Sequence, residues 1–162
     1  MAQFVPSRAH QPQAFAVFLN PALVGAVQAV MAREYEIKRG RAMAWPLTLI
    51  LPVLVLHGST REALPSSTRT HLPTWAARNP GLLAGFGARV QSTLPVMREG
   101  LRFALRHGLI QVESGAVSSA PLPAQRAEGE LQELLKAARF VGRWAATVDQ
   151  PSTLLALLGV RV

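Results

Sequence analysis

Apolar residues recur three and four positions apart from residue 23 onward, which is the spacing of one face of an α-helix. Asn20 is a good N-cap for such a helix. Pro21 suits its first position, because the N–H that proline lacks would have no helical partner there. Gly40 can end the helix in the left-handed conformation. The pattern therefore predicts a helix over residues 21–38.

Residues 44–56 form the longest apolar stretch of the chain, and two prolines, Pro46 and Pro52, interrupt it. A membrane-spanning helix needs about 20 apolar residues, so this stretch is too short to cross a bilayer. We interpret it as a helix over residues 46–56 that is buried on most sides. Pro52 is expected to kink this helix or to mark its true start, and His57-Gly58 is expected to end it.

The next part of the chain alternates between irregular and helical patterns. Residues 59–71 are polar and predicted to be irregular, whereas residues 72–78 are predicted to form a short helix. Two further helices are expected over residues 81–92 and 95–107. Pro95 should separate them, since it removes a backbone donor.

A β-hairpin is predicted directly after that last helix. Residues 109–113 alternate as in a strand, Ser114-Gly115 signals a turn, and residues 116–119 supply the returning strand. A helix followed at once by a hairpin is typical of the closing part of a winged helix-turn-helix. The expected fold class is mainly α with a small β-hairpin, in a winged helix-turn-helix-like helical domain over residues 1–120.

The remaining residues, 121–162, are interpreted as a C-terminal helical extension that packs on this domain or on a partner. Two prolines near residue 122 indicate a linker, residues 127–147 form an amphipathic pattern, and a short helix begins at Pro151. The apolar ending suggests docking. The candidate docking residues are Leu154, Leu155, Leu157 and Leu158.

Charge is distributed unevenly along the chain. Residues 1–98 carry ten Lys and Arg against three acids, a net charge of +7, while residues 99–162 carry seven against six, a net charge of +1. A basic surface attracts phosphate backbones and acidic protein faces. The alternative is that an arginine-rich composition follows a GC-rich genome and has no role in binding.

Two groups of residues are candidates for contact with DNA or a partner. Arg98, Arg102 and Arg106 share one face of the helix before the hairpin, and the alternative is a solvated face on which Glu99 pairs with an arginine. Thr68 and Arg69 could hold a phosphate or a carboxylate. The alternative for this loop is that it caps the helix that starts at residue 72.

Residue types that carry out chemistry are sparse. The chain has no cysteine, which excludes disulfides, thiolate zinc ligands and cysteine nucleophiles. Its four histidines lack zinc spacing, and no phosphate loop or nucleophile elbow occurs. His57 and His107 each precede a glycine at a helix end, where the dipole favours their charged form. We therefore expect no catalytic site, metal or cofactor.

Taken together, the motifs resemble the middle component of bacterial three-component ABC ATPase systems, the group that includes the small subunit of Lamassu-type anti-phage defence. The matching features lie in the same order along nearly the whole chain. They are Asn20-Pro21-Ala22, the apolar helix over 46–56 with His57, Leu64-Pro65, Ser67-Thr68-Arg69-Thr70, Trp75, Asn79-Pro80, Arg98-Glu99, residues 103–108, Gly142-Arg143-Trp144 and residues 157–161.

This resemblance implies a non-catalytic adaptor that links an SMC-like ABC ATPase to an effector subunit, often a nuclease. A stand-alone winged-helix transcription regulator is the alternative. Non-specific contact with DNA and a homodimer remain open. The first ten residues lack the basic flank and apolar run of a signal peptide, so a cytoplasmic protein without membrane contact is expected.

Overall fold

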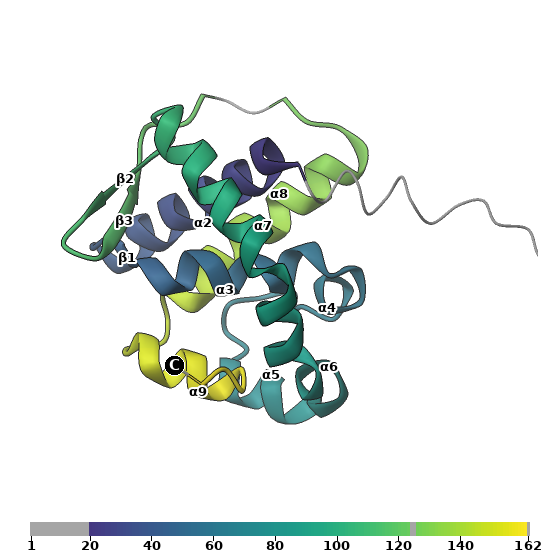
Figure 1. Ribbon diagram of the computed structural model, residues 1–162. Helices are drawn as coiled ribbons and strands as arrows, with labels where there is room; N and C mark the ends of the chain where they lie inside the picture. The colour runs from purple at the N-terminus through teal and green to yellow at the C-terminus, as the bar shows by residue number, and fades with distance from the viewer. Residues whose placement is uncertain (1–19, 124–125, 162) are drawn as a thin grey trace, which may run out of the picture.

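The computed structural model describes residues 20–123 and 126–161, which are mainly helical with one small antiparallel sheet (Figure 1). This confirms the expected fold class, mainly α with a small β component. The expectation for the first ten residues, which include one of the four histidines, His10, lies outside the described residues. The elements are α2 (Pro21–Arg39), β1 (Met43–Ala44), α3 (Trp45–Leu56), α4 (Gly58–Glu62), α5 (Leu72–Arg78), α6 (Pro80–Ala84), α7 (Phe86–Arg106), β2 (Ile110–Glu113), β3 (Ala116–Ser119), α8 (Gly129–Ala145) and α9 (Pro151–Leu157).

Helix α2 begins and ends where its capping residues predict. The side chain of Asn20 accepts a hydrogen bond of 2.9 Å from the backbone N–H of Ala22. At the other end Gly40 is left-handed, with φ 77°, and its N–H donates to the carbonyl oxygen of Glu36. Both bonds satisfy backbone groups that a helix end leaves without a partner.

Two neighbouring helices pack closely against α2, and glycines make this approach possible. A Cβ on Gly25 of α2 would lie 2.7 Å from the carbonyl oxygen of Gly100 on α7, and a Cβ on Gly100 would overlap Val24. On the other side, a Cβ on Gly142 of α8 would overlap the carbonyl oxygen of Met31. Helix α2 is therefore held between α7 and α8.

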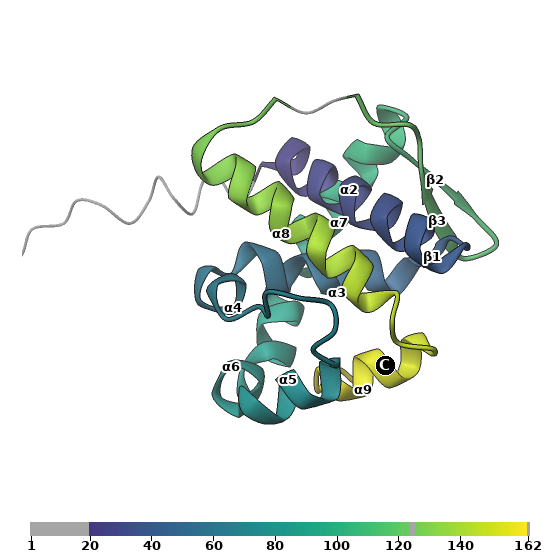
Figure 2. The ribbon, with the colours of Figure 1, turned by 180° about the vertical axis from the view of Figure 1, so that it is seen from behind.

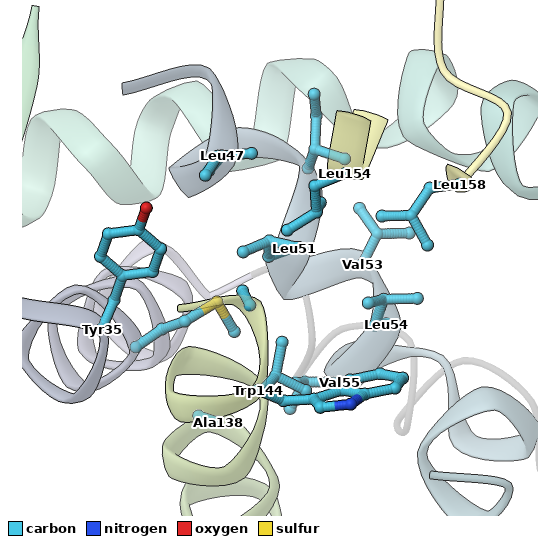
Figure 3. Close-up of a cluster of buried hydrophobic side chains, with 14 of the residues drawn as sticks. Tyr35, Leu47, Leu51, Val53, Leu54, Val55, Ala138, Trp144, Leu154 and Leu158 are labelled. Carbon is cyan, nitrogen blue, oxygen red and sulfur yellow. The ribbon is translucent and has the colours of Figure 1, made fainter. Parts of the chain in front are cut away.

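Helix α3 is buried over residues 47–55, as its uniformly apolar sequence predicts. Figures 1 and 2 show α5, α6 and α9 on the side of α3 that faces away from α2 and α8. In Figure 3, Leu154 of α9 and Leu158, which follows α9, reach the side chains of α3, and Trp144 of α8 lies beside Val55. Buried side chains of α2, α3, α5, α7, α8 and α9 thus belong to one cluster.

The three strands form a sheet in the order β1-β3-β2, with antiparallel pairing throughout. Ser114 and Gly115 connect β2 to β3 with φ 51° and 77°, the backbone of a two-residue hairpin turn with two left-handed residues. The hairpin is therefore confirmed. Strand β1 was not predicted, because its two residues are too few to show an alternating pattern.

The largest differences from the predicted helices lie at residues 58–62 and at Pro95. Residues 58–62 form α4 instead of an irregular segment, and the buried Thr60 anchors this helix through a 2.9 Å hydrogen bond between its Oγ1 and Nδ1 of His57. Helix α7 continues through Pro95, and the break lies at Gly85 instead. Packing of Met97 and other buried residues of α7 outweighs the loss of one backbone donor at Pro95.

Candidate interaction surface

The three arginines predicted to share a helix face are all exposed on α7. Residues four apart advance by about 40° around a helix, so Arg98, Arg102 and Arg106 spread over one side. Arg102 forms an ion pair with Glu99, and both side chains are largely exposed (60% and 49%), so this pair contributes about 0–1 kcal/mol. Among the described residues, Arg98 and Arg106 form no ion pair.

Large apolar side chains are exposed at the end of the molecule that carries the sheet. Trp45 at the start of α3 is 47% exposed, Val112 of β2 46% and Leu105 of α7 41%. The backbone N–H of Trp45 donates a hydrogen bond of 3.0 Å to the carbonyl oxygen of Gly115, so the hairpin turn fixes the start of α3. An exposed tryptophan on a fixed backbone is well suited to binding another protein.

A groove of about 440 Å³, which Trp45 lines, lies between the start of α3, one side of α7 and the C-terminal segment. Its apolar lining includes Leu49, Ile50 and Leu94, and two arginines, Arg98 and Arg161, line it as well. Of the predicted contact residues, Arg98 alone lines this groove. The groove was not predicted, because it joins residues from three segments that lie far apart in the sequence.

Thr68 and Arg69 lie on a different face of the molecule. Figures 1 and 2 show the connection between α4 and α5 on the side opposite to α7. Two indoles hold the backbone of this loop: Trp75 donates to the carbonyl oxygen of Ala63 and Trp144 to that of Thr70, both at 2.7 Å. The structure therefore does not bring the two candidate groups together.

The loop also differs from the alternative interpretation, in which it capped the following helix. The N-cap of α5 is His71, and no side chain forms a capping hydrogen bond there. The two tryptophans meet edge to face, with ring centroids 5.3 Å apart and planes at 86°. Thr68 is half-buried and Arg69 is exposed beside this anchored segment.

The four leucines proposed for partner docking belong to the chain's own core. Leu154, Leu155 and Leu158 are buried, and Leu157 is partly buried against the same cluster. The backbone N–H of Leu158 donates to the carbonyl oxygen of Leu154, which completes the last turn of α9. Because these side chains pack on α3 and its neighbours, they present little surface to a partner in this structure.

His57 occupies the junction of α3 and α4, and its electrostatics correct one expectation. Burial, and to a smaller extent the guanidinium of Arg89, lower the pKa of His57 from its ordinary value of 6.5. A histidine stabilised as a cation by the helix dipole would have a raised pKa. The neutral imidazole, with Nδ1 near the hydroxyls of Ser59 and Thr60, is therefore the favoured form.

A second hollow of about 590 Å³ lies between the α4 region and α8. Arg61 and Lys136 line it together with the acids Glu62, Glu130 and Glu133. Arg61 approaches Glu130 to 3.7 Å and donates a hydrogen bond of 2.8 Å to the carbonyl oxygen of Val55. The charges of this hollow are thus partly balanced within the chain.

Residues 20–123 and 126–161 contain no group of three or more His, Asp or Glu side chains that could hold a metal ion. Over the same residues, no helix combines the length and apolar character that crossing a bilayer requires. What the described surface does offer is a basic helix face, exposed apolar side chains and an apolar groove, the features of a module that binds other macromolecules.

Comparison with protein families identifies the chain. A model of the ABC-three component (ABC-3C) system Middle Component 3 matches residues 9–162, so the chain belongs to this family. Comparison with curated proteins gives no match, and neither does comparison with solved structures. The predicted relationship to the middle components of three-component ABC systems is confirmed.

Proposed function

We propose that this chain is a non-catalytic adaptor that links an SMC-like ABC ATPase to an effector subunit in a bacterial anti-phage defence complex of the Lamassu type. The observation that carries this proposal is the family match over residues 9–162. An adaptor needs surface for two large partners. The exposed side chains of Trp45, Leu105 and Val112, together with the arginine face of α7, are suited to that role.

The arrangement of elements supports a winged-helix interpretation of the adaptor. Helix α2, strand β1, helix α3, helix α7 and the β2-β3 hairpin follow one another in the chain, with α4, α5 and α6 inserted before α7. The hairpin follows α7 directly, and β1 pairs with its inner strand β3. In this interpretation α7 takes the place of the recognition helix and the hairpin is the wing.

Co-purification tests the adaptor proposal. The tagged chain is expressed together with the ATPase and the effector encoded beside it. We expect a stable complex that contains all three subunits, and no ATPase or nuclease activity from the chain alone. If the tagged chain retains neither partner, the proposal fails.

One observation favours a second function, that of a stand-alone DNA-binding regulator. Arg98, Arg102 and Arg106 are exposed on the helix that precedes a hairpin, as direct contact with DNA would require. The hairpin itself, residues 110–119, has no Lys or Arg and carries Glu113. An acidic wing favours contact with protein over contact with phosphate, so the adaptor remains the preferred function.

A further inference from the structure

We propose that the groove between α3, α7 and the C-terminal segment is the docking site for an acidic segment of a partner protein that inserts an aromatic or aliphatic side chain. This inference rests on the proposed adaptor function and assigns part of it to a defined surface. The groove volume of about 440 Å³ lies within the range of about 300–1,000 Å³ of pockets that bind organic ligands.

The floor of the groove is apolar and belongs to the rigid core. Leu49 and Ile50 of α3 line it and are themselves buried, and Val90 of α7 is buried beside them. Side chains that belong to the core keep their positions without a ligand. An inserted apolar side chain therefore gains burial while the groove loses little conformational freedom.

The charged residues that line the groove are all basic in the part of the chain that the structure describes. Arg98 from α7 and Arg161 from the C-terminal segment both line the groove and are exposed. The described lining residues include no Asp or Glu. Two guanidinium groups with no acid among the described lining residues favour carboxylates on the occupant. The hollow near α4 differs in this respect, because three acids, Glu62, Glu130 and Glu133, line it together with its basic residues.

Trp45 forms the part of the groove nearest to the sheet. Its backbone N–H donates a hydrogen bond to the carbonyl oxygen of Gly115, and its backbone carbonyl oxygen accepts a hydrogen bond of 2.6 Å from Oγ1 of Thr48. The backbone is thus fixed on both sides while the indole remains half-exposed. Tryptophan and arginine are the residue types that most often dominate the energy of a protein interface.

The C-terminal segment closes the groove against α7 through a close contact. Gly159 is left-handed, with φ 70°, and a Cβ on Gly87 would lie 3.3 Å from its carbonyl oxygen. This contact places Val160 and Arg161 at the groove. An apolar floor with arginines at its edge suits a peptide better than a nucleic-acid backbone, because phosphates gain nothing from apolar side chains.

Binding of each partner subunit, immobilised separately, is measured for the full-length chain and for the variants Trp45→Ala and Arg98→Glu. We expect Trp45→Ala to lower the affinity for one partner by about thirtyfold, which corresponds to about 2 kcal/mol. Arg98→Glu should lower the affinity for the same partner by about tenfold or more. Ile37→Ala and Arg78→Glu are the controls, since both side chains are exposed outside the groove and should leave affinity unchanged.

Photo-crosslinking in the assembled complex provides a second measurement. The exposed Gln91, which lines the groove, is replaced by p-benzoylphenylalanine, with the same replacement at the exposed Gln132 of α8 as control. We expect cross-links from position 91 to a carboxylate-rich peptide, and we expect this peptide to belong to the partner whose binding Trp45→Ala weakens.

The outcomes separate the two proposals. If the wild-type chain binds neither partner, the adaptor function and the docking site both fail. If it binds but the groove variants match their controls, the docking site fails and the adaptor function stands. Cross-links from position 91 to DNA or to a second copy of the chain would also overturn the docking site.

Discussion

The side-chain amide of Gln28 donates a hydrogen bond of 3.0 Å to the carbonyl oxygen of Thr48, the oxygen that Pro52 leaves without its helical donor. The same nitrogen donates at 2.9 Å to the carbonyl oxygen of Met97. One buried glutamine of α2 therefore bonds to both α3 and α7. This explains how α3 passes through a proline although its residues 47–55 are buried.

Replacing this glutamine should destabilise the fold. Gln28→Leu keeps a side chain of similar size but leaves the carbonyl oxygen of Thr48 buried without a donor. We expect the free energy of unfolding to fall by about 1–3 kcal/mol, as measured by urea denaturation. Pro52→Ala restores a backbone donor to Thr48, so Pro52→Ala should recover part of this loss in the Gln28→Leu background. Strictly additive effects of the two substitutions would contradict this role.

Close packing of α2 and α8 leads to a second stability prediction. Gly142→Ala places a methyl group against the backbone of Met31, which cannot move aside as a side chain could. We expect a loss of about 1–3 kcal/mol, the usual cost of overpacking. Gly81→Ala is the matched control, because a Cβ there meets nothing within 4 Å. It should be neutral or stabilising by up to about 1 kcal/mol, so equal losses in thermal unfolding would contradict the prediction.

The sequence predicted elements whose signals are local. The caps Asn20 and Gly40 set the ends of α2, and Ser114-Gly115 set the hairpin turn, because each depends on the backbone preference of one or two residues. The prediction that Pro95 separates two helices was wrong, because it used only the unfavourable effect of proline within a helix. Packing along the rest of α7 decides the outcome there, and such packing is not visible in a single sequence.

The candidate surface was predictable only in part. Four-residue spacing placed Arg98, Arg102 and Arg106 together without knowledge of the fold. The groove was not predicted, because it needs the start of α3, α7 and the C-terminal segment to meet. For the same reason the sequence could not decide whether the leucines near the C-terminus dock on the domain itself or on a partner, whereas the structure packs them on the chain's own core.

The loop over residues 63–71 should depend on its two tryptophans. Trp144→Phe removes the indole donor to the carbonyl oxygen of Thr70 while keeping an aromatic ring in the core. We expect faster trypsin cleavage after the exposed Arg69, since local opening of the loop becomes easier. Trp45→Phe, at an exposed tryptophan on another face, should leave this cleavage rate unchanged. A rate that is also unchanged in Trp144→Phe would show that the indole bond does not restrain the loop.

The lowered pKa of His57 predicts a loss of stability in mild acid. The unfolded chain binds a proton at the ordinary value of about 6.5, whereas burial and Arg89 hold the folded pKa below it. Above that value the imidazole is neutral in both the folded and the unfolded state, so it does not change the free energy of unfolding. As the pH falls below it, protonation favours the unfolded state. Thermal unfolding between pH 7 and pH 5 should therefore show a smaller decline in His57→Gln than in the wild type, and parallel curves would contradict the assignment.

Salt dependence of DNA binding distinguishes the two candidate functions of the α7 face. Each phosphate contact adds about −0.9 to the slope of log K against log salt, so Arg98, Arg102 and Arg106 together account for a slope no steeper than about −3. The pairing of Arg102 with Glu99 and the absence of Lys and Arg from the hairpin should make binding weak. We expect mobility shifts of unrelated duplex DNA only at low salt, with Arg106→Ala reducing the slope by about one. Tight, sequence-specific binding by the isolated chain at about 0.15 M salt would instead favour the regulator, because an adaptor has no need to recognise bases.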